Sequence, residues 1–382
     1  MEQKESKKTI RIFALASFLN DLGSDIIYPL WPMFVTSVLG ANMAVLGFLD
    51  GLGEALVSLS QAVSGYVSDR IRKRKVFVWL GYLCAGASRI GYSVSSVWQH
   101  LIPFRILDRA GKIRSAPRDA IIADISRKET RGHNFGFLRA MDNLGAVCGI
   151  LISIVFLKLL GYKRLFLLAA FPSLIGATII FFLIKERQAE DIKVYKGISF
   201  KDLDRNFRLY LFLSAIFALG SFSYSFLLIY AKGFGFSVAF VPVLYLIFTV
   251  VAAIFSLPFG RLSDRIGRKP VLAAAYILWM LVCGLLILSQ RHWVVILSFI
   301  FYGLHKAALE PVQKTFVSEL APKDYKASSL GGFQMVIGLS ALPASLCAGL
   351  LWDKVGIAAP LYFSLGLTIL SGGILFLVKE IK

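Results

Sequence analysis

Two copies of one charged motif, GYVSDRIRKRK at residues 65–75 and GRLSDRIGRKP at residues 260–270, decide the fold of this 382-residue chain. The copies begin 195 residues apart, which is close to half of the chain length. The same offset recurs in three further pairs, Trp98 and Trp293, Asp124 and Glu319, and Gly136 and Gly331. An offset that holds in four places indicates an internal duplication, so we expect two repeated halves.

The composition places both halves in a membrane. Hydrophobic residues make up 57% of the chain, charged residues only 17%, and the mean hydropathy is +0.70. A soluble globular domain is closer to half apolar and a quarter charged. A bilayer needs about 20 apolar residues per helix. Twelve segments meet that need, at residues 11–38, 43–68, 75–97, 99–124, 133–158, 163–185, 208–231, 238–261, 270–290, 293–318, 326–352 and 358–379.

A polar stretch separates the sixth segment from the seventh. We therefore expect an all-α integral membrane protein with twelve transmembrane helices in two pseudo-symmetric six-helix bundles. The N-terminal bundle is expected at residues 1–185, a cytoplasmic linker at 186–207 and the C-terminal bundle at 208–382. Lysines and arginines outside the segments or at their ends number 27 on the side of the termini and six on the other side. The positive-inside rule thus places both termini in the cytoplasm.

This topology accounts for most of the net charge of +19. Basic residues at the membrane surface attract anionic lipid headgroups. We therefore expect membrane lipid, and not nucleic acid, as the partner of the basic surface.

The loop between the eighth and ninth segments, G-x-L-S-D-R-x-G-R-K, resembles the loop motif of the major facilitator superfamily. The first copy has Arg72 where that family prefers glycine. The chain is also similar to a bacterial subgroup with the signature DR-x-GK-x-R-x-x-PRD, here from Asp108 to Asp119. The resemblance covers the whole chain and implies a multi-pass secondary transporter of a bacterial inner membrane, working by alternating access.

The resemblance also implies a cytoplasmic gate at the two loop motifs, where an aspartate and arginines tie helix ends together. Carboxylates can cap helix N-termini, and guanidinium groups pair with carboxylates. Positive-inside topology alone would explain the basic residues but not the repeated aspartate. The expected gate residues are Gly65, Asp69, Arg70, Gly260, Asp264, Arg265 and Arg268.

The fourth segment carries more charge than a lipid-facing helix can hold. Eight ionisable residues lie between Pro103 and Asp124, and each charge at the bilayer centre costs about 2.5–3.5 kcal/mol. A helical projection places Arg114 and Arg118 roughly opposite the others, unless Pro117 breaks the register. The predicted common face, which must point to other helices or to a water-filled cavity, holds Arg105, Asp108, Arg109, Lys112 and Asp119.

Neighbouring segments supply counter-charges. The first segment has Asn20, Asp21 and Asp25, and the second has Asp50 and Glu54 one turn apart. Seven embedded acids and seven embedded bases in the N-terminal half indicate a network of ion pairs, not an open anion trap. The C-terminal half has fewer embedded ionisable residues. It offers Lys306 with Glu310, and a polar and aromatic face around Tyr224.

These residues predict a proton-coupled antiporter that exports a small organic molecule and acts as a monomer. A carboxylate near a base can release and rebind a proton as the base changes partner. The sequence has no nucleotide-binding or catalytic motif, so we expect no enzyme activity and no cofactor, and a proton or other cation gradient as energy source. The candidate substrate and coupling residues are Asn20, Asp21, Asp25, Asp50, Glu54, Arg105, Asp108, Arg109, Lys112, Arg139, Asp142, Tyr224, Lys306 and Glu310.

Two alternatives stay open. No metal site is assigned, but Asp21, Asp25, Asp50 and Glu54 offer oxygen ligands that calcium or magnesium accepts. They would make the chain a divalent-cation transporter or a cation antiporter, although nearby Arg109 and Lys112 count against it. The second alternative is a non-transporting membrane sensor. The central linker is too short to hold an output domain, which counts against this alternative.

Overall fold

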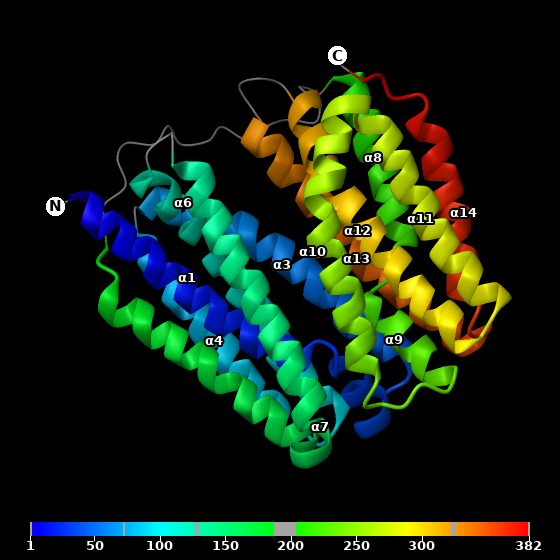
Figure 1. Cartoon of the computed structure of the whole chain (residues 1–382), viewed down its shortest axis with the longest axis horizontal. Helices are drawn as coiled ribbons and strands as arrows, with labels where there is room; N and C mark the ends of the chain where they lie inside the picture. The colour runs from blue at the N-terminus through cyan, green and yellow to red at the C-terminus, as the bar shows by residue number, and fades with distance from the viewer. Residues whose placement is uncertain (1, 72, 127–129, 187–203, 322–325, 381–382) are drawn as a thin grey trace. The chain divides into compact units, whose positions relative to one another are not determined.

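A computed structural model describes residues 2–71, 73–126, 130–186, 204–321 and 326–380, and these residues are helical with short connections (Figure 1). The first eight elements are α1 (Glu2–Ile27), α2 (Trp31–Met33), the π-helical turn η1 (Phe34–Val38), α3 (Met43–Ile71), α4 (Lys75–Val94), the 3-10 turn η2 (Trp98–His100), α5 (Leu101–Ala110) and the 3-10 turn η3 (Gly111–Arg114). The others are α6 (Ser115–Ile125), α7 (Arg131–Leu183), α8 (Arg205–Gly220), α9 (Tyr224–Gly233), α10 (Val241–Ile266), α11 (Arg268–Leu288), α12 (His292–Leu320), α13 (Lys326–Lys354) and α14 (Ala359–Leu375).

Every apolar segment expected from the sequence is helical over most of its length. Among the described residues, seven helices are long and apolar enough to cross a membrane, and Ala359–Leu375 is a shorter apolar helix. The seven are Met43–Ser68, His133–Leu183, Arg205–Gly233, Val241–Ile266, Arg268–Leu288, His292–Leu320 and Ser329–Lys354. Two predicted segments form the two arms of α7, which meet at the non-helical Gly161, and α1, α4, α5 and α6 are not among the seven. The count of twelve spans therefore stays a prediction.

The helices form two compact units. The first unit consists of Met1–Gly40 and Leu56–Tyr195, and the second consists of Ala41–Ala55 and Lys196–Lys382. The division runs through α3, so the compact units differ from the repeated halves. The bundle boundaries at residues 185 and 208 remain a prediction.

In the first unit, α1 and α4 both pack along α7 (Figure 1). Two glycines of α7 allow its close approach to α1. A Cβ atom at Gly145 would lie 2.3 Å from the carbonyl oxygen of Phe18, and one at Gly149 would lie 2.2 Å from that of Leu22. Small residues at this spacing let helix backbones touch, and the contact fixes the depth of α1 in the unit.

The fourth predicted segment is not one regular helix. α5 ends at Ala110, a 3-10 turn follows over Gly111–Arg114, and α6 begins at Ser115. The turn lies against α4, where a Cβ atom at Gly81 would be 2.4 Å from the carbonyl oxygen of Gly111. Because a 3-10 turn has three residues per turn and not 3.6, the common face predicted from Arg105 to Asp119 is interrupted at this point.

In the second unit, the first half of α3 packs against α13. A Cβ atom at Gly47 would lie 2.0 Å from the carbonyl oxygen of Ser345, and one at Gly349 would lie 2.3 Å from that of Met43. The Asp353 carboxylate accepts hydrogen bonds from the backbone N–H groups of Met43 and Ala44, at 3.2 and 2.8 Å. Close packing and a cap therefore fasten this part of α3 to α13.

Candidate functional site

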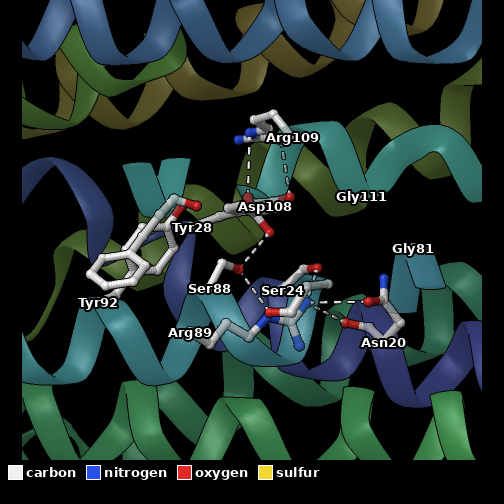
Figure 2. A network of polar contacts seen from close by, with 12 residues as sticks. Asn20, Ser24, Tyr28, Gly81, Ser88, Arg89, Tyr92, Asp108, Arg109 and Gly111 are labelled. Atoms are coloured by element: carbon white, nitrogen blue, oxygen red, sulfur yellow. Dashed lines mark hydrogen bonds and ion pairs between the residues drawn. The ribbon is translucent and has the colours of Figure 1, made fainter. Parts of the chain in front are cut away.

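Arg89 of α4 joins three helices of the first unit and is only 1% exposed. Its Nη1 donates to the carbonyl of Ala169 at 2.9 Å and to Ser173 Oγ at 2.5 Å, both on α7. Its Nη2 donates to Ser24 Oγ of α1 at 2.7 Å and to the Asn20 carbonyl at 3.1 Å (Figure 2). Among the described residues no carboxylate lies within 4 Å of this guanidinium. The Arg89 guanidinium is therefore hydrogen-bonded to neutral oxygen atoms in place of water.

The hydrogen bonds of Arg89 continue through Asn20 to Asp21, both on α1. Asn20 is 1% exposed, and its Oδ1 accepts from Arg89 Nη2 at 3.3 Å and from Ser173 Oγ at 2.9 Å. Its Nδ2 donates to Asp21 Oδ1 at 2.9 Å. Asp21 is half-buried, and Asp25, one turn further along α1, is buried. The predicted polar group of α1 therefore lies in contact with Arg89, one of the seven embedded bases, which is not among the predicted substrate and coupling residues.

Two arginines of α5 stack on aromatic rings near the end of α1. Arg105 Cζ lies 4.5 Å from the centre of the Trp31 ring, and Arg109 Cζ lies 5.1 Å from that of Tyr28. Arg109 Nη1 also donates to the Tyr28 hydroxyl at 3.2 Å. Stacking on an aromatic face stabilises a guanidinium group that has little access to water.

Asp108 is the carboxylate between these bases. Its Oδ2 lies 3.5 Å from Arg109 Nε, and its Oδ1 accepts from Ser88 Oγ at 3.5 Å (Figure 2). Arg89, Arg105 and the half-buried Lys112 also act on it electrostatically. The structure thus brings together the predicted residues Arg105, Asp108, Arg109 and Lys112, with more bases than acids around this one carboxylate.

A second ionised group lies where α6 meets α1 and α7. Arg118 donates to Asp119 Oδ1 at 2.9 Å and to Ser17 Oγ at 2.7 Å, and its Nη1 lies 3.9 Å from Asp142. Arg139 Nη1 lies 3.7 Å from the other oxygen of the buried Asp142, while the side chain of Arg139 is 73% exposed. Asp142 is therefore the shared acid of this group.

The second unit holds the predicted residues of α3. The buried Asp50 accepts a 2.7 Å hydrogen bond from Ser223 Oγ of the connection before α9. Glu54 is exposed and acts electrostatically on Lys306 and Tyr302 of α12. The packing of α3 on α13 groups Asp50 and Glu54 with the second unit, and their part in the charge network of the N-terminal half stays a prediction.

Lys306 and Glu310 form an accessible ion pair on α12. Lys306 Nζ lies 3.2 Å from Glu310 Oε1, and the two side chains are 38% and 61% exposed. The ammonium group also lies 6.0 Å from the centre of the Tyr302 ring. Together with Glu54, this pair places two acids and one base on an aromatic surface of the second unit.

Tyr224, at the start of α9, belongs to the same aromatic surface. Its ring centre lies 5.3 Å from that of Tyr245 and 6.2 Å from that of Phe248, both on α10. Phe248 in turn lies 5.1 Å from Tyr302, and Trp279 of α11 lies 5.7 Å from Tyr302. Rings at these separations form a continuous aromatic surface.

Arg268 is the centre of the second gate motif. It lies 2.5 Å from Asp264 Oδ1 and 2.7 Å from Glu319 Oε1, and its Nη1 donates to Ser263 Oγ at 2.7 Å. Its backbone N–H donates to the Glu380 carboxylate. Arg265 is exposed and makes no ion pair in the described part of the chain. Of the two predicted arginines, the structure therefore brings only Arg268 into the ion-pair group.

Gly267 explains why the second motif has glycine. Its φ of +99° lies in the region that favours glycine, and a Cβ atom there would lie 2.8 Å from Glu380 Oε2. Gly260, by contrast, has open space around it. A side chain at position 267 would therefore displace the carboxylate from the start of α11.

The ion pair of the first gate motif is made by Arg74, which is not among the predicted gate residues. Arg74 pairs with Asp124, and its backbone N–H donates to Glu186 Oε1 at 2.8 Å. The Asp69 side chain lies outside the described residues, Arg70 is exposed, and Gly65 meets only the Ala116 side chain. Arg74 and Arg268 thus make equivalent contacts: each side chain pairs with an acid, and each backbone N–H donates to a glutamate. The 195-residue offset, however, aligns Arg268 with Lys73 and not with Arg74.

The four carboxylates of the cation alternative lie in two different units of the structure. In the described part of the chain, no group of three or more His, Cys, Asp or Glu side chains could hold a metal ion. Asp21 and Asp25 belong to the first unit, whereas Asp50 and Glu54 belong to the second. Any contribution of these four residues to a divalent-cation site therefore stays a prediction.

Comparison with known proteins gives matches over nearly the whole chain. The family model described as Major Facilitator Superfamily matches residues 13–239 and 210–382. An uncharacterized MFS-type transporter of Methanocaldococcus jannaschii is 37% identical, over 98% of this chain and 96% of that protein. The quinolone resistance protein NorA of Staphylococcus aureus is 22% identical, over 98% and 97% of the two chains.

Solved structures agree on the fold. The inward-facing, unoccupied structure of a bacterial homolog of the human lysosomal transporter Spinster has a TM-score of 0.77 and 14% identity, and the match covers 98% of this chain and 97% of that one. The nucleoside transporter NupG has a TM-score of 0.74 and 15% identity, over 97% and 98%. With the repeated gate motifs and the helical units described above, these matches show that the chain belongs to the Major Facilitator Superfamily of membrane transporters.

Proposed function

We propose that this transporter is a proton-coupled antiporter that exports a small organic molecule by alternating access. It acts as a monomer with twelve spans in a bacterial-type inner membrane, with both termini in the cytoplasm. The likeness to NorA, named for quinolone resistance, supports an organic substrate. The excess of basic residues on the side of the termini supports the orientation.

The accessible group of Glu54, Lys306 and Glu310 carries the proposal. Lys306 and Glu310 lie near the middle of α12, a helix apolar enough to cross a membrane. Charges at such a depth are costly and mark substrate or proton pathways when they face a polar cavity. Their side-chain exposures of 38% and 61% support contact with solvent or with a substrate.

One base shared by two acids provides a route to coupling. Lys306 contacts Glu310 directly and interacts electrostatically with Glu54. A carboxylate that loses its cationic neighbour binds a proton more readily. Movement of Lys306 between the acids, or its displacement by a substrate, would therefore exchange a proton, and the Tyr302 and Tyr224 rings would contact the apolar part of the substrate.

The first step of the test is a thermal-stability screen of purified protein with organic compounds and divalent ions. A ligand that binds the folded state raises the melting temperature by mass action. Stabilisation by a divalent ion and by no organic compound would favour the cation transporter instead.

Flux measurements in proteoliposomes then test coupling. A stabilising compound should drive proton flux in the wild type, and Glu54→Gln and Glu310→Gln should weaken coupling. Glu5→Gln, a matched change near the N-terminus, should not. We also expect weaker coupling in Asp21→Asn and Asp25→Asn. The proposal fails if no compound of a broad panel drives proton flux, or if coupling is unchanged in all four embedded-acid variants.

A further inference from the structure

Two neighbouring residues of α1 have different surroundings. Asn20 is 1% exposed, whereas Asp21 is half-buried. A side-chain amide has one oxygen that only accepts and one nitrogen that only donates. The orientation of the Asn20 amide therefore decides whether Asp21 meets a donor or an acceptor.

Donors from two other helices fix that orientation. Arg89 Nη2 of α4 and Ser173 Oγ of α7 both donate to Asn20 Oδ1, at 3.3 and 2.9 Å (Figure 2 shows Arg89 and Asn20). A flipped amide would turn its N–H groups toward these donors, so that Ser173 Oγ would lose the acceptor of its hydroxyl hydrogen and Arg89 Nη2 would face another donor. The unflipped amide points Nδ2 at Asp21 Oδ1, at 2.9 Å.

We propose that Arg89 is a positioning residue for proton coupling, which holds the Asn20 amide so that its N–H donates to Asp21. The inference rests on the proposed function in one respect, namely that Asp21 is a coupling carboxylate. A donor to a carboxylate favours its ionised form. Arg89 thereby sets the pH at which Asp21 takes up a proton, without contact with the substrate.

The shape of the site favours arginine over any other base. One guanidinium reaches the Asn20 carbonyl, the Asn20 side chain and Ser24 with Nη2 alone, and Ser173 with Nη1. A lysine ammonium is a point charge and lacks this planar fork. Gly23 makes room for the group, since a Cβ atom there would lie 2.1 Å from Arg89 Nη1.

Other charges near Asp21 come from the packed elements. Arg89 of α4 and Asp142 of α7 interact with it electrostatically, with opposite sign. Asp142 is in turn acted on by Arg118 of α6, Lys112 of η3 and Arg139 of α7. Asp25 is the acidic neighbour on α1 itself. Asp21 therefore interacts with an attracting guanidinium and a repelling carboxylate, in addition to the amide N–H of Asn20.

The test uses the full-length protein in lipid and two readouts. Infrared spectroscopy follows the protonated carboxyl band of Asp21, identified by its loss in Asp21→Asn, between about pH 4 and pH 9. Proteoliposome flux gives the pH dependence of transport. Asn20→Leu removes the donor, and Arg89→Lys keeps the charge but loses the fork. Ser24→Ala is the matched control, because it removes one neighbour of Arg89 and leaves the amide in place.

We expect Asn20→Leu and Arg89→Lys each to raise the Asp21 midpoint by about one pH unit, the size expected for a hydrogen bond to a charged group. The double variant should shift no further than Asn20→Leu alone, and Ser24→Ala should keep the wild-type midpoint. If Arg89→Lys does not fold, Ser173→Ala replaces it, since it removes a donor to Asn20 Oδ1 without changing any charge. Its expected shift is smaller and in the same direction.

Unchanged midpoints in the folded variants would overturn the inference, as would the absence of an Asp21 band in both the wild type and Asn20→Leu. A shifted midpoint without proton-coupled flux for any substrate would support the role of Arg89 and reject the proposed function. Coupled flux with an unshifted Asp21 would do the reverse.

Discussion

Replacement of Asp353 by alanine tests how the first half of α3 is fastened to α13. The substitution removes both acceptors at the start of α3, where Oδ1 binds the N–H of Met43 and Oδ2 that of Ala44. The first N–H groups of a helix have no partner within the helix. The Asn42 side chain, which accepts from the N–H of Val45 at 3.0 Å, stays in place.

The expected loss follows from these contacts. A side-chain cap is worth about 0.5–2 kcal/mol, and a negative charge at a helix N-terminus adds about 0.3–1 kcal/mol. Asp353 is exposed, so water replaces part of what the carboxylate provides. We expect a loss of about 1–2 kcal/mol, which is a factor of about 5–30 in a local opening equilibrium.

Hydrogen–deuterium exchange of the peptide that contains Met43 and Ala44 measures this factor directly. Exchange should be about 5–30 times faster in Asp353→Ala. Asp353→Asn, which keeps one oxygen acceptor, should lie between the variant and the wild type. Lys354→Gln changes a neighbouring exposed charge and should have no effect on these amides. An unchanged rate in Asp353→Ala would refute the capping argument, because water would then accept the hydrogen bonds of these N–H groups as well as the carboxylate does.

Two further substitutions test the gate motif and the packing of α7. Arg268→Gln removes two ion pairs worth about 1 kcal/mol at this partly exposed site and should lower the melting temperature by about 2–4 °C. Arg265→Gln, on an exposed side chain with no ion pair among the described residues, should not, and equal shifts would contradict the assigned roles. Gly145→Leu should prevent recovery of monodisperse protein in size-exclusion chromatography, because Phe18 O lies 2.3 Å from the position of the new Cβ. Gly136→Leu, with open space around it, should be tolerated, and recovery of both variants would contradict the packing.

The helices could be predicted because their signals are local. Apolar runs of span length and basic connections define the segments without reference to any partner. The interruption at Gly111 could not be predicted in the same way, because it depends on the contact between that turn and Gly81 of α4. The sequence also predicts separate fifth and sixth segments, and α7 consists of two helical arms that meet at the non-helical Gly161.

The site was predicted as a set of residue types, but not as a set of partners. Asp21 and Asn20 lie in the polar group of α1 as expected, yet their link to Arg89 requires three helices to meet. Glu54 precedes the bases of the fourth segment in the chain, but the packing of α3 places it near Lys306. Partner choice between distant segments depends on tertiary packing, which periodicity does not report.

Gly161 constrains how the first unit can deform. With a φ of +69°, this single residue reverses the chain between the two arms of α7 (Figure 1). No loop residues separate the arms other than this glycine. A displacement at the far end of one arm must therefore bend the other arm or change the backbone conformation at Gly161. A short glycine–serine insertion after Gly161 would lengthen the reversal without altering a single charged group. The stiffness of this joint can therefore be varied separately from the chemistry of the ionised residues.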